Sequence, residues 1–277
     1  MRKSPCPAHL VEPAANHKLF NLENVVCTPH LGASTDEAQE NVALQVAEQM
    51  ADYLVKGAVT NALNMPSISA EEAPRLKPYV ALAEKLGSFA GQLTDSDING
   101  IVIEYAGDVG EMNTKALTSA AVSGILKEQL GSINMVSAPV IAKERGIKVD
   151  EVKQTKRGAY ETYIRITIKT EKYERSVAGT VFGDGKPRII QIKGIELECN
   201  FGPHMLYITN NDKPGFVGRV GTLLGNAGIN MGTFHLGRIT EGGDAISIIE
   251  TDGPVPQLVM DDVQKVPNVI QVKALRF

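Results

Sequence analysis

Residues 203–277 alternate between strand-like and helix-like apolar spacing, and this alternation limits the possible folds more than any other feature of the chain. The spacing predicts strands over 205–209, 229–239, 245–250 and 269–272, and helices over 217–224 and 255–266. In the first helix we expect Val217, Val220, Leu223 and Leu224 to face inward. The order strand, helix, strand, strand, helix, strand predicts a ferredoxin-like domain.

The preceding segment predicts a second, small α+β domain. Helical spacing covers 75–92 and 113–130, with a shorter helix over 138–145 capped by Ser137, and alternation predicts strands over 101–105, 163–169, 174–182 and 189–192. Tight turns join the last three strands, which predicts an antiparallel meander. A linker rich in proline and serine precedes this domain. We therefore expect domains at 1–66, 67–202 and 203–277, and an α+β fold class overall.

The N-terminal segment has a different pattern. Val25–Cys27 reads as a short buried strand, and Pro29, His30 and Gly32 follow it. Ser34 and Glu37 have capping-box spacing, which predicts a helix over 35–56. A strand, a histidine and a glycine turn into a helix are typical of the edge of an open α/β sheet where catalytic groups gather.

A strand is also expected over 59–63, after the helix. The helix over 35–56 has a broad apolar face, which is an exposed patch without a sheet to cover it. We therefore expect residues 1–66 to be poorly ordered or to be buried by self-association.

Composition excludes several function classes. The chain has 277 residues, 43% of them hydrophobic and 22% charged, with a formal net charge of −4, so there is no general basic field for nucleic acid or anionic membranes. The three cysteines, Cys6, Cys27 and Cys199, lack metal-ligand or redox spacing, which favours a reducing cytoplasm and no metal site. No apolar run approaches the length needed to span a membrane.

The run VVCTPHLGASTDEAQENVALQVAEQM resembles the end of the nucleotide-binding domain in NAD-dependent D-2-hydroxyacid dehydrogenases. Together with the segments that follow, the chain resembles the long-type D-3-phosphoglycerate dehydrogenases of L-serine biosynthesis, which oxidise 3-phosphoglycerate to 3-phosphohydroxypyruvate. This resemblance implies that His30 is the proton donor and acceptor of hydride transfer. It also implies a partial NAD site at His30, Leu31, Gly32 and Ala33.

The sequence lacks other parts of that catalytic domain. No G-x-G-x-x-G turn occurs, and Gly215, Gly218, Gly221 and Gly225 have the wrong spacing. The chain therefore resembles the C-terminal half of a dehydrogenase. We expect it to bind NAD poorly and to be catalytically incompetent by itself.

Residues 67–202 resemble the intervening domain of the same family, which in some members binds an anionic allosteric ligand. Arg188 matches one cationic position of those members, but Asn200 and Glu250 stand at two others. Losing two cations, one of them to an opposite charge, weakens an anion site. Arg188 is therefore either a remaining anion contact or, as we favour, a solvated charge at the end of a strand.

The run DKPGFVGRVGTLLGNAGIN resembles an ACT domain, a module that binds amino acids between paired copies. The resemblance implies that Asn210, Asp212 and Asn230 contact an effector, L-serine or another small amino acid, and that the ACT domain forms homo-oligomers. Turn geometry alone also explains Asn and Asp at two of these positions.

Two function classes follow from these patterns. The chain is either the oxidoreductase portion of a phosphoglycerate dehydrogenase, or an amino-acid-sensing oligomerisation module with no catalysis of its own. A purely structural dimerisation segment is a third interpretation.

Overall fold

The computed structural model describes residues 18–26, 32, 34–154 and 159–277. The chain divides into two compact units, Met1–Ala51 and Asp52–Phe277. In the first, a short 3-10 helix, η1, spans Lys18–Asn21. The strand predicted at Val25–Cys27 is wrong for its described part, because Val25 and Val26 lie in no strand and Val26 is 92% exposed.

Helix α1 spans Asp36–Lys56, close to the prediction. The Thr35 hydroxyl accepts from the Ala38 N–H at 3.2 Å, so this capping bond comes from Thr35, one residue after the expected Ser34. None of the residues of α1 is buried, and its large apolar side chains are exposed at Val42, Leu44, Val46, Met50, Tyr53, Leu54 and Val55. The strand predicted over 59–63 is reduced to one bridge between Val59 and Ile68.

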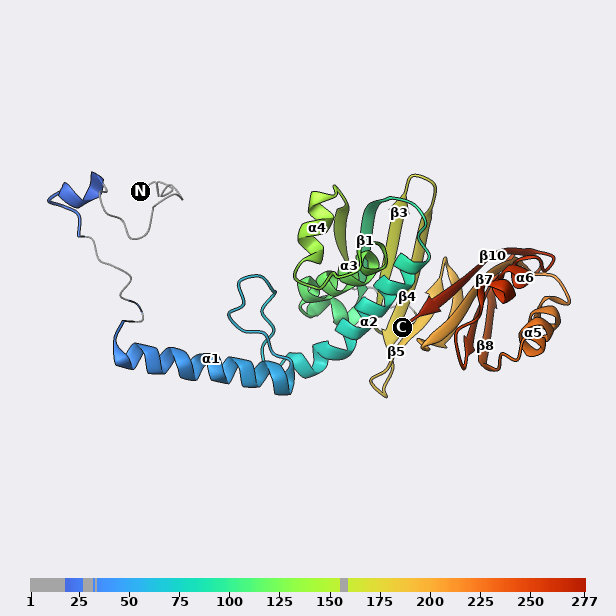
Figure 1. The fold of residues 1–277 in the computed structure, drawn as a ribbon, viewed down its shortest axis with the longest axis horizontal. Helices are drawn as coiled ribbons and strands as arrows, with labels where there is room; N and C mark the ends of the chain where they lie inside the picture. The colour runs from blue at the N-terminus through green and yellow to red at the C-terminus, as the bar shows by residue number, and fades with distance from the viewer. Residues whose placement is uncertain (1–17, 27–31, 33, 155–158) are drawn as a thin grey trace. The chain divides into compact units, whose positions relative to one another are not determined.

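A six-stranded sheet forms the first part of the second unit, with strand order β2-β1-β3-β4-β5-β6 (Figure 1). Its strands are β1 (Ile98–Ala106), β2 (Lys148–Gln154), β3 (Tyr163–Thr170), β4 (Glu174–Val181), β5 (Pro187–Ile192) and β6 (Ile195–Asn200). The predicted meander is confirmed for β3, β4 and β5. The sequence analysis missed β2, which pairs parallel to β1, and β6, which follows β5.

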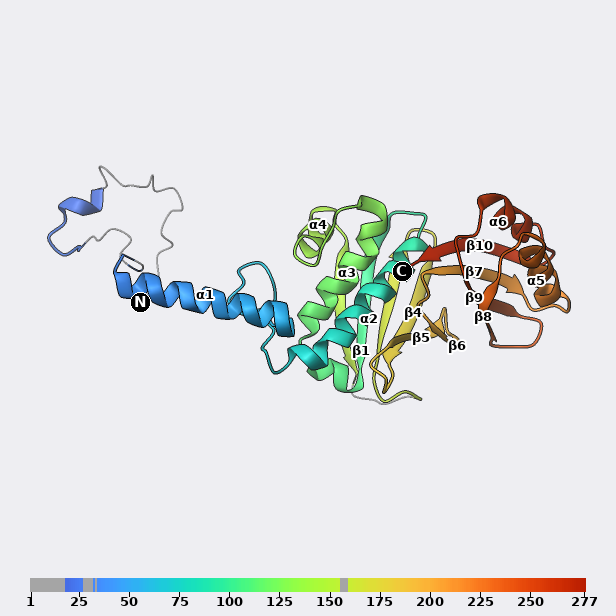
Figure 2. The same cartoon turned by 60° about the horizontal axis from the view of Figure 1, so that its bottom comes forward.

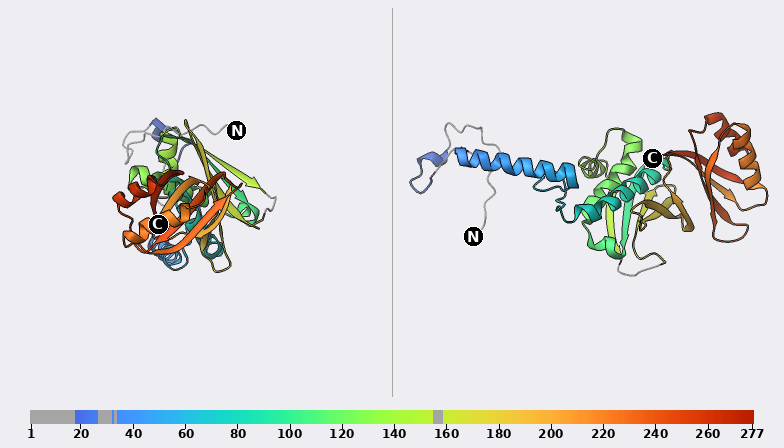
Figure 3. Two further views of the ribbon diagram at one scale, coloured as in Figure 1. Left: turned by 90° about the vertical axis from the view of Figure 1, so that its right-hand side faces the viewer. Right: turned by 90° about the horizontal axis from the view of Figure 1, so that it is seen from below.

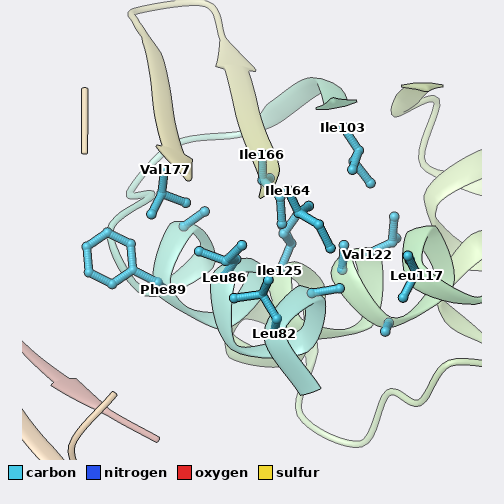
Figure 4. Close-up of a cluster of buried hydrophobic side chains, with 14 of the residues drawn as sticks. Leu82, Leu86, Phe89, Ile103, Leu117, Val122, Ile125, Ile164, Ile166 and Val177 are labelled. Carbon is cyan, nitrogen blue, oxygen red and sulfur yellow. The ribbon is translucent and has the colours of Figure 1, made fainter. Parts of the chain in front are cut away.

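Helices α2 (Ala73–Gln92) and α3 (Thr114–Leu130) pack against this sheet, and α4 (Ala138–Glu144) follows them. Leu82 and Leu86 of α2 and Ile125 of α3 lie in one buried cluster with strand residues such as Ile164 and Ile166 (Figure 4). These contacts fix the two predicted helices on one face of the sheet.

The starts of α3 and α4 differ, because the cap of α3 was not predicted, whereas a cap at Ser137 was predicted for α4. The Asn113 carboxamide caps α3 by accepting from the Ala116 N–H at 3.4 Å. Ser137 precedes α4 but makes no side-chain capping bond, which corrects the prediction. Asn134 Oδ1 instead accepts from the N–H groups of Val136 and Ser137, at 2.9 and 3.0 Å. This Asx-type turn, rather than a serine cap, leads the chain into α4.

The C-terminal part has the predicted element order. It contains β7 (His204–Asn211), α5 (Phe216–Asn226), β8 (Met231–Arg238), β9 (Asp244–Thr251), α6 (Gln257–Gln264) and β10 (Val269–Arg276). These strands form an antiparallel sheet ordered β10-β7-β9-β8, and α5 and α6 lie on one side of it (Figure 2). The ferredoxin-like prediction is therefore confirmed, although Val217 is 50% exposed rather than inward-facing.

The other face of this sheet packs against the first part of the same unit (Figure 3). Tyr207 of β7 meets the Phe89 ring edge-on, with centroids 6.0 Å apart. The Gln92 carboxamide donates to the carbonyl of Arg276 at 2.8 Å and accepts from its N–H at 2.9 Å. Lys273 pairs with Asp95 at 2.6 Å. The four-stranded sheet is therefore held by apolar, hydrogen-bonding and ionic contacts together.

Candidate functional site

The best-defined groove at a predicted site lies where β7 ends and α5 begins. It encloses about 420 Å³. Its walls come from the end of β7, the turn into α5, the end of β8 and the hairpin after β8, and they include Asn210, Asp212, Phe216, Leu236 and Arg238. Two of the three predicted effector residues, Asn210 and Asp212, are thus brought together.

Strand register sets the positions of two groove residues. Asn210 on β7 and Arg238 on β8 are both paired with Ala245 on the intervening strand β9. Side chains directly opposite each other across a sheet project from the same face. Asn210 and Arg238 therefore lie on the same face of the sheet, on either side of Ala245.

The first turn of α5 forms one wall of the groove. Gly215 has φ +91°, a left-handed conformation that lets the chain turn sharply from the polar loop into the helix. No side chain caps the N-terminus of α5, and Phe216, Val217 and Gly218 of its first turn line the groove. The first N–H groups of a helix have no partner within the helix, so this wall favours an anionic group.

Asp212 is already engaged in the groove. Its carboxylate contacts the Arg238 guanidinium and also accepts from the Gly242 N–H at 3.2 Å. The hydrogen bond from Arg238, followed by that from Gly242, lowers the pKa of Asp212. The partner of this carboxylate is Arg238, a site residue that was not predicted from the sequence. Arg238 lies two residues after Leu236 on β8, so both side chains lie on the same face of the sheet, and this spacing is the sequence signal that could have found it.

Asn210 is buried and only partly satisfied. It is 1% exposed, and its Nδ2 donates to the Asn211 carbonyl at 2.9 Å. Its Oδ1 has no hydrogen-bond partner among the described residues. A buried acceptor without a partner is costly, so this oxygen is suited to receive a donor from a bound molecule.

Asn230 lies apart from this groove. Its Nδ2 donates to Asp252 Oδ2 at 2.8 Å, and it is not among the groove residues. One chain therefore brings together Asn210 and Asp212 but not Asn230.

Arg188 is held by its neighbours on the six-stranded sheet. It donates to Asn200 Oδ1 at 3.0 Å and to Asp184 Oδ2 at 2.8 Å, and its guanidinium lies 4.3 Å from the centre of the Phe182 ring. Local partners thus occupy much of its hydrogen-bonding capacity. An anion site at Arg188 stays a prediction.

His30, Leu31 and Ala33 of the predicted catalytic and NAD site lie outside the described residues, while Gly32 lies in a turn. Described residues 18–26, 32 and 34–51 contain no β-strand, and the sequence has no G-x-G-x-x-G turn. The described residues therefore supply no strand leading into such a turn, which a dinucleotide cradle needs.

Neither a metal-binding cluster nor a helix able to cross a membrane occurs in the part of the chain that the structure describes. No group of three His, Cys, Asp or Glu side chains there is arranged to hold a metal ion. Among the same residues, no helix combines the length and apolar character needed to cross a membrane.

Comparison with known proteins gives this architecture a class. Residues 75–193 match the D-3-phosphoglycerate dehydrogenase intervening domain, and residues 204–268 match the ACT domain. The chain thus has the architecture of an intervening domain followed by an ACT regulatory domain. The chain matches the C-terminal half of long-type D-3-phosphoglycerate dehydrogenases.

Relatives from different organisms align with nearly the whole chain. The D-3-phosphoglycerate dehydrogenase of Bacillus subtilis (strain 168) is 34% identical over 266 residues, covering 96% of this chain and 51% of the relative. That of Methanocaldococcus jannaschii is 36% identical over 267 residues, with coverage of 96% and 51%. The chain spans about half the length of the curated relatives it matches.

One solved structure aligns with the C-terminal part. The ACT domain from GTP pyrophosphokinase of Chlorobium tepidum covers 29% of this chain and 99% of its own, at 18% identity and a TM-score of 0.22. This score is too low to bear on the fold.

Proposed function

We propose that this chain is the regulatory half of a D-3-phosphoglycerate dehydrogenase and that its ACT groove binds L-serine or another small amino acid. The observation that supports this most directly is the shared groove of Asn210, Asp212 and the N-terminus of α5. The helix N–H groups suit a carboxylate, while Asp212 and the unpaired Asn210 Oδ1 suit an ammonium or hydroxyl donor.

The activity of the complete protein would follow from the family. It is the NAD-dependent oxidation of 3-phosphoglycerate to 3-phosphohydroxypyruvate, on the path to L-serine, in the cytoplasm. His30 would exchange the hydroxyl proton there. General acid–base catalysis needs a bound substrate within hydrogen-bonding reach, so we expect no turnover from this chain alone.

A second copy of the chain would complete the groove. Asn230 is outside the groove of its own chain, so its predicted effector contact requires the partner copy. The edge strands β8 and β10 carry the exposed apolar residues Leu236 and Ile270. Covering such edges by pairing with another copy removes unpaired backbone groups from solvent. We therefore expect a homo-oligomer, and a monomer by light scattering at micromolar concentration would contradict it.

Thermal denaturation with increasing L-serine tests the binding proposal. A ligand that binds only the folded protein raises Tm with a saturable dependence on its concentration. The chain should show this rise, and Asn210→Ala should weaken it. An unchanged Tm at millimolar L-serine and other small amino acids would refute the proposal. NADH formation from 3-phosphoglycerate by the purified chain would refute the prediction of catalytic incompetence.

A further inference from the structure

We propose that Arg238 selects for zwitterionic ligands by exchanging its ion pair with Asp212 for the carboxylate of a bound amino acid. This inference rests on the proposed function and deepens it, because it assigns a binding role to a residue outside the predicted effector set. In the structure, Asp212 and Arg238 neutralise each other in the groove. A ligand that carries both charges can replace that one ion pair with two.

The contacts of the two side chains indicate that Arg238, rather than Asp212, moves when the ion pair opens. The Asp212 side chain is 19% exposed, and its carboxylate is also held by the Gly242 N–H at 3.2 Å. The Arg238 side chain is 48% exposed, and Asp212 is its hydrogen-bonding partner among the described residues. Asp212 therefore stays in place when the pair opens, while the guanidinium can turn toward a new anion.

The position of Arg238 suits a carboxylate that also meets α5. Arg238 and Asn210 lie on either side of Ala245, and the N-terminus of α5 forms the adjoining wall. A carboxylate at this wall would receive helix N–H groups and a guanidinium fork. The ammonium group of the same ligand would then meet the released Asp212 and the unpaired Asn210 Oδ1.

The charge balance of the groove favours a net-neutral ligand. Its lining carries two acidic residues, Asp212 and Glu241, and two basic residues, Lys213 and Arg238. A ligand with only a carboxylate would open the ion pair and leave Asp212 without a cation, and an amine would leave Arg238 without an anion. Unpaired charges in a partly desolvated site are costly, so ligands with one charge are rejected.

The test uses three ligands that differ in charge: L-serine, serinol, which lacks the carboxylate, and L-glycerate, which has a hydroxyl in place of the ammonium group. Isothermal titration calorimetry on the full chain should show L-serine binding at least about tenfold more tightly than either analogue. Arg238→Ala should weaken L-serine binding about tenfold or more and strengthen serinol binding, because Asp212 becomes available. Asp212→Asn should weaken L-serine binding and strengthen L-glycerate binding.

Arg145→Ala provides the matched control, because it removes an exposed arginine that does not line the groove. It should change all three affinities less than threefold. The opposite shifts for L-serine and serinol separate ion-pair exchange from simple damage to the groove, which would weaken both. Unchanged L-serine affinity in Arg238→Ala, or weaker binding of both ligands, would overturn the inference. Absence of L-serine binding in the unmodified chain would overturn the proposed function as well.

Discussion

Replacing Gly124 with alanine should destabilise the packing of α2 against α3, although alanine is the better helix former. A Cβ at Gly124 would lie 2.2 Å from the Glu84 carbonyl oxygen and 2.8 Å from the Ser88 amide nitrogen. Both atoms belong to the backbone of α2, so no side-chain rotation can relieve the overlap. The helices must separate, which loosens the core around Leu86 and Ile125.

The magnitude follows from two opposing effects. Overpacking a close-packed core costs about 1–3 kcal/mol, and the backbone contact at Gly124 puts this site at the upper end. The gain in helix propensity from glycine to alanine offsets about 1 kcal/mol. The net loss in free energy of unfolding should be about 2 kcal/mol, a fall in Tm of roughly 4–8 °C for a unit of this size.

Urea denaturation followed by circular dichroism measures this loss, and Gly225→Ala is the matched control. Gly225 lies in helix α5, and a Cβ there would meet no atom within 4 Å. That substitution should raise stability by about 0.5–1 kcal/mol. If Gly124→Ala is as stable as the unmodified protein, with an unchanged m-value, the close approach of α2 and α3 is refuted.

Three further predictions concern single side chains. Burial raises the pKa of the Cys199 thiol to about 12. Iodoacetamide at pH 8 should therefore leave the Cys199 peptide unmodified until the protein is denatured. Labelling of this peptide in the native protein, detected by mass spectrometry, would contradict the burial of Cys199. The pKa of Asp212 is lowered by Arg238, so its contribution to stability is present above its unfolded pKa and is lost as the pH falls through the lowered value. The Tm difference between the protein and Asp212→Asn should therefore be constant well above the unfolded pKa of about 4 and shrink as the pH falls below that value; a difference that grows on acidification would have the wrong sign. Gln92→Ala should lower the free energy of unfolding by about 1–2 kcal/mol, because it removes two hydrogen bonds to Arg276. Urea denaturation measures this loss, and an unchanged stability would show that these bonds contribute nothing.

Several errors of the sequence analysis have one physical origin. Strand β2 reads Lys-Val-Asp-Glu-Val-Lys-Gln, with charged residues on both faces, because it lies at the edge of its sheet. The apolar residues Val25 and Val26 fit a strand pattern but lie in none. A strand exists only where another strand pairs with it, and the local pattern carries no information about that partner.

The sequence by itself determined the element order of residues 203–277, the helices α2 and α3, and the position of two groove residues, Asn210 and Asp212. These features follow from hydrophobic periodicity and turn chemistry, which act between near neighbours in the chain. Only the tertiary structure decided that Arg238 pairs with Asp212 and that Gly124 touches the backbone of α2. Strand register and helix approach set these contacts between distant residues, and register depends on how whole faces pack rather than on any local spacing.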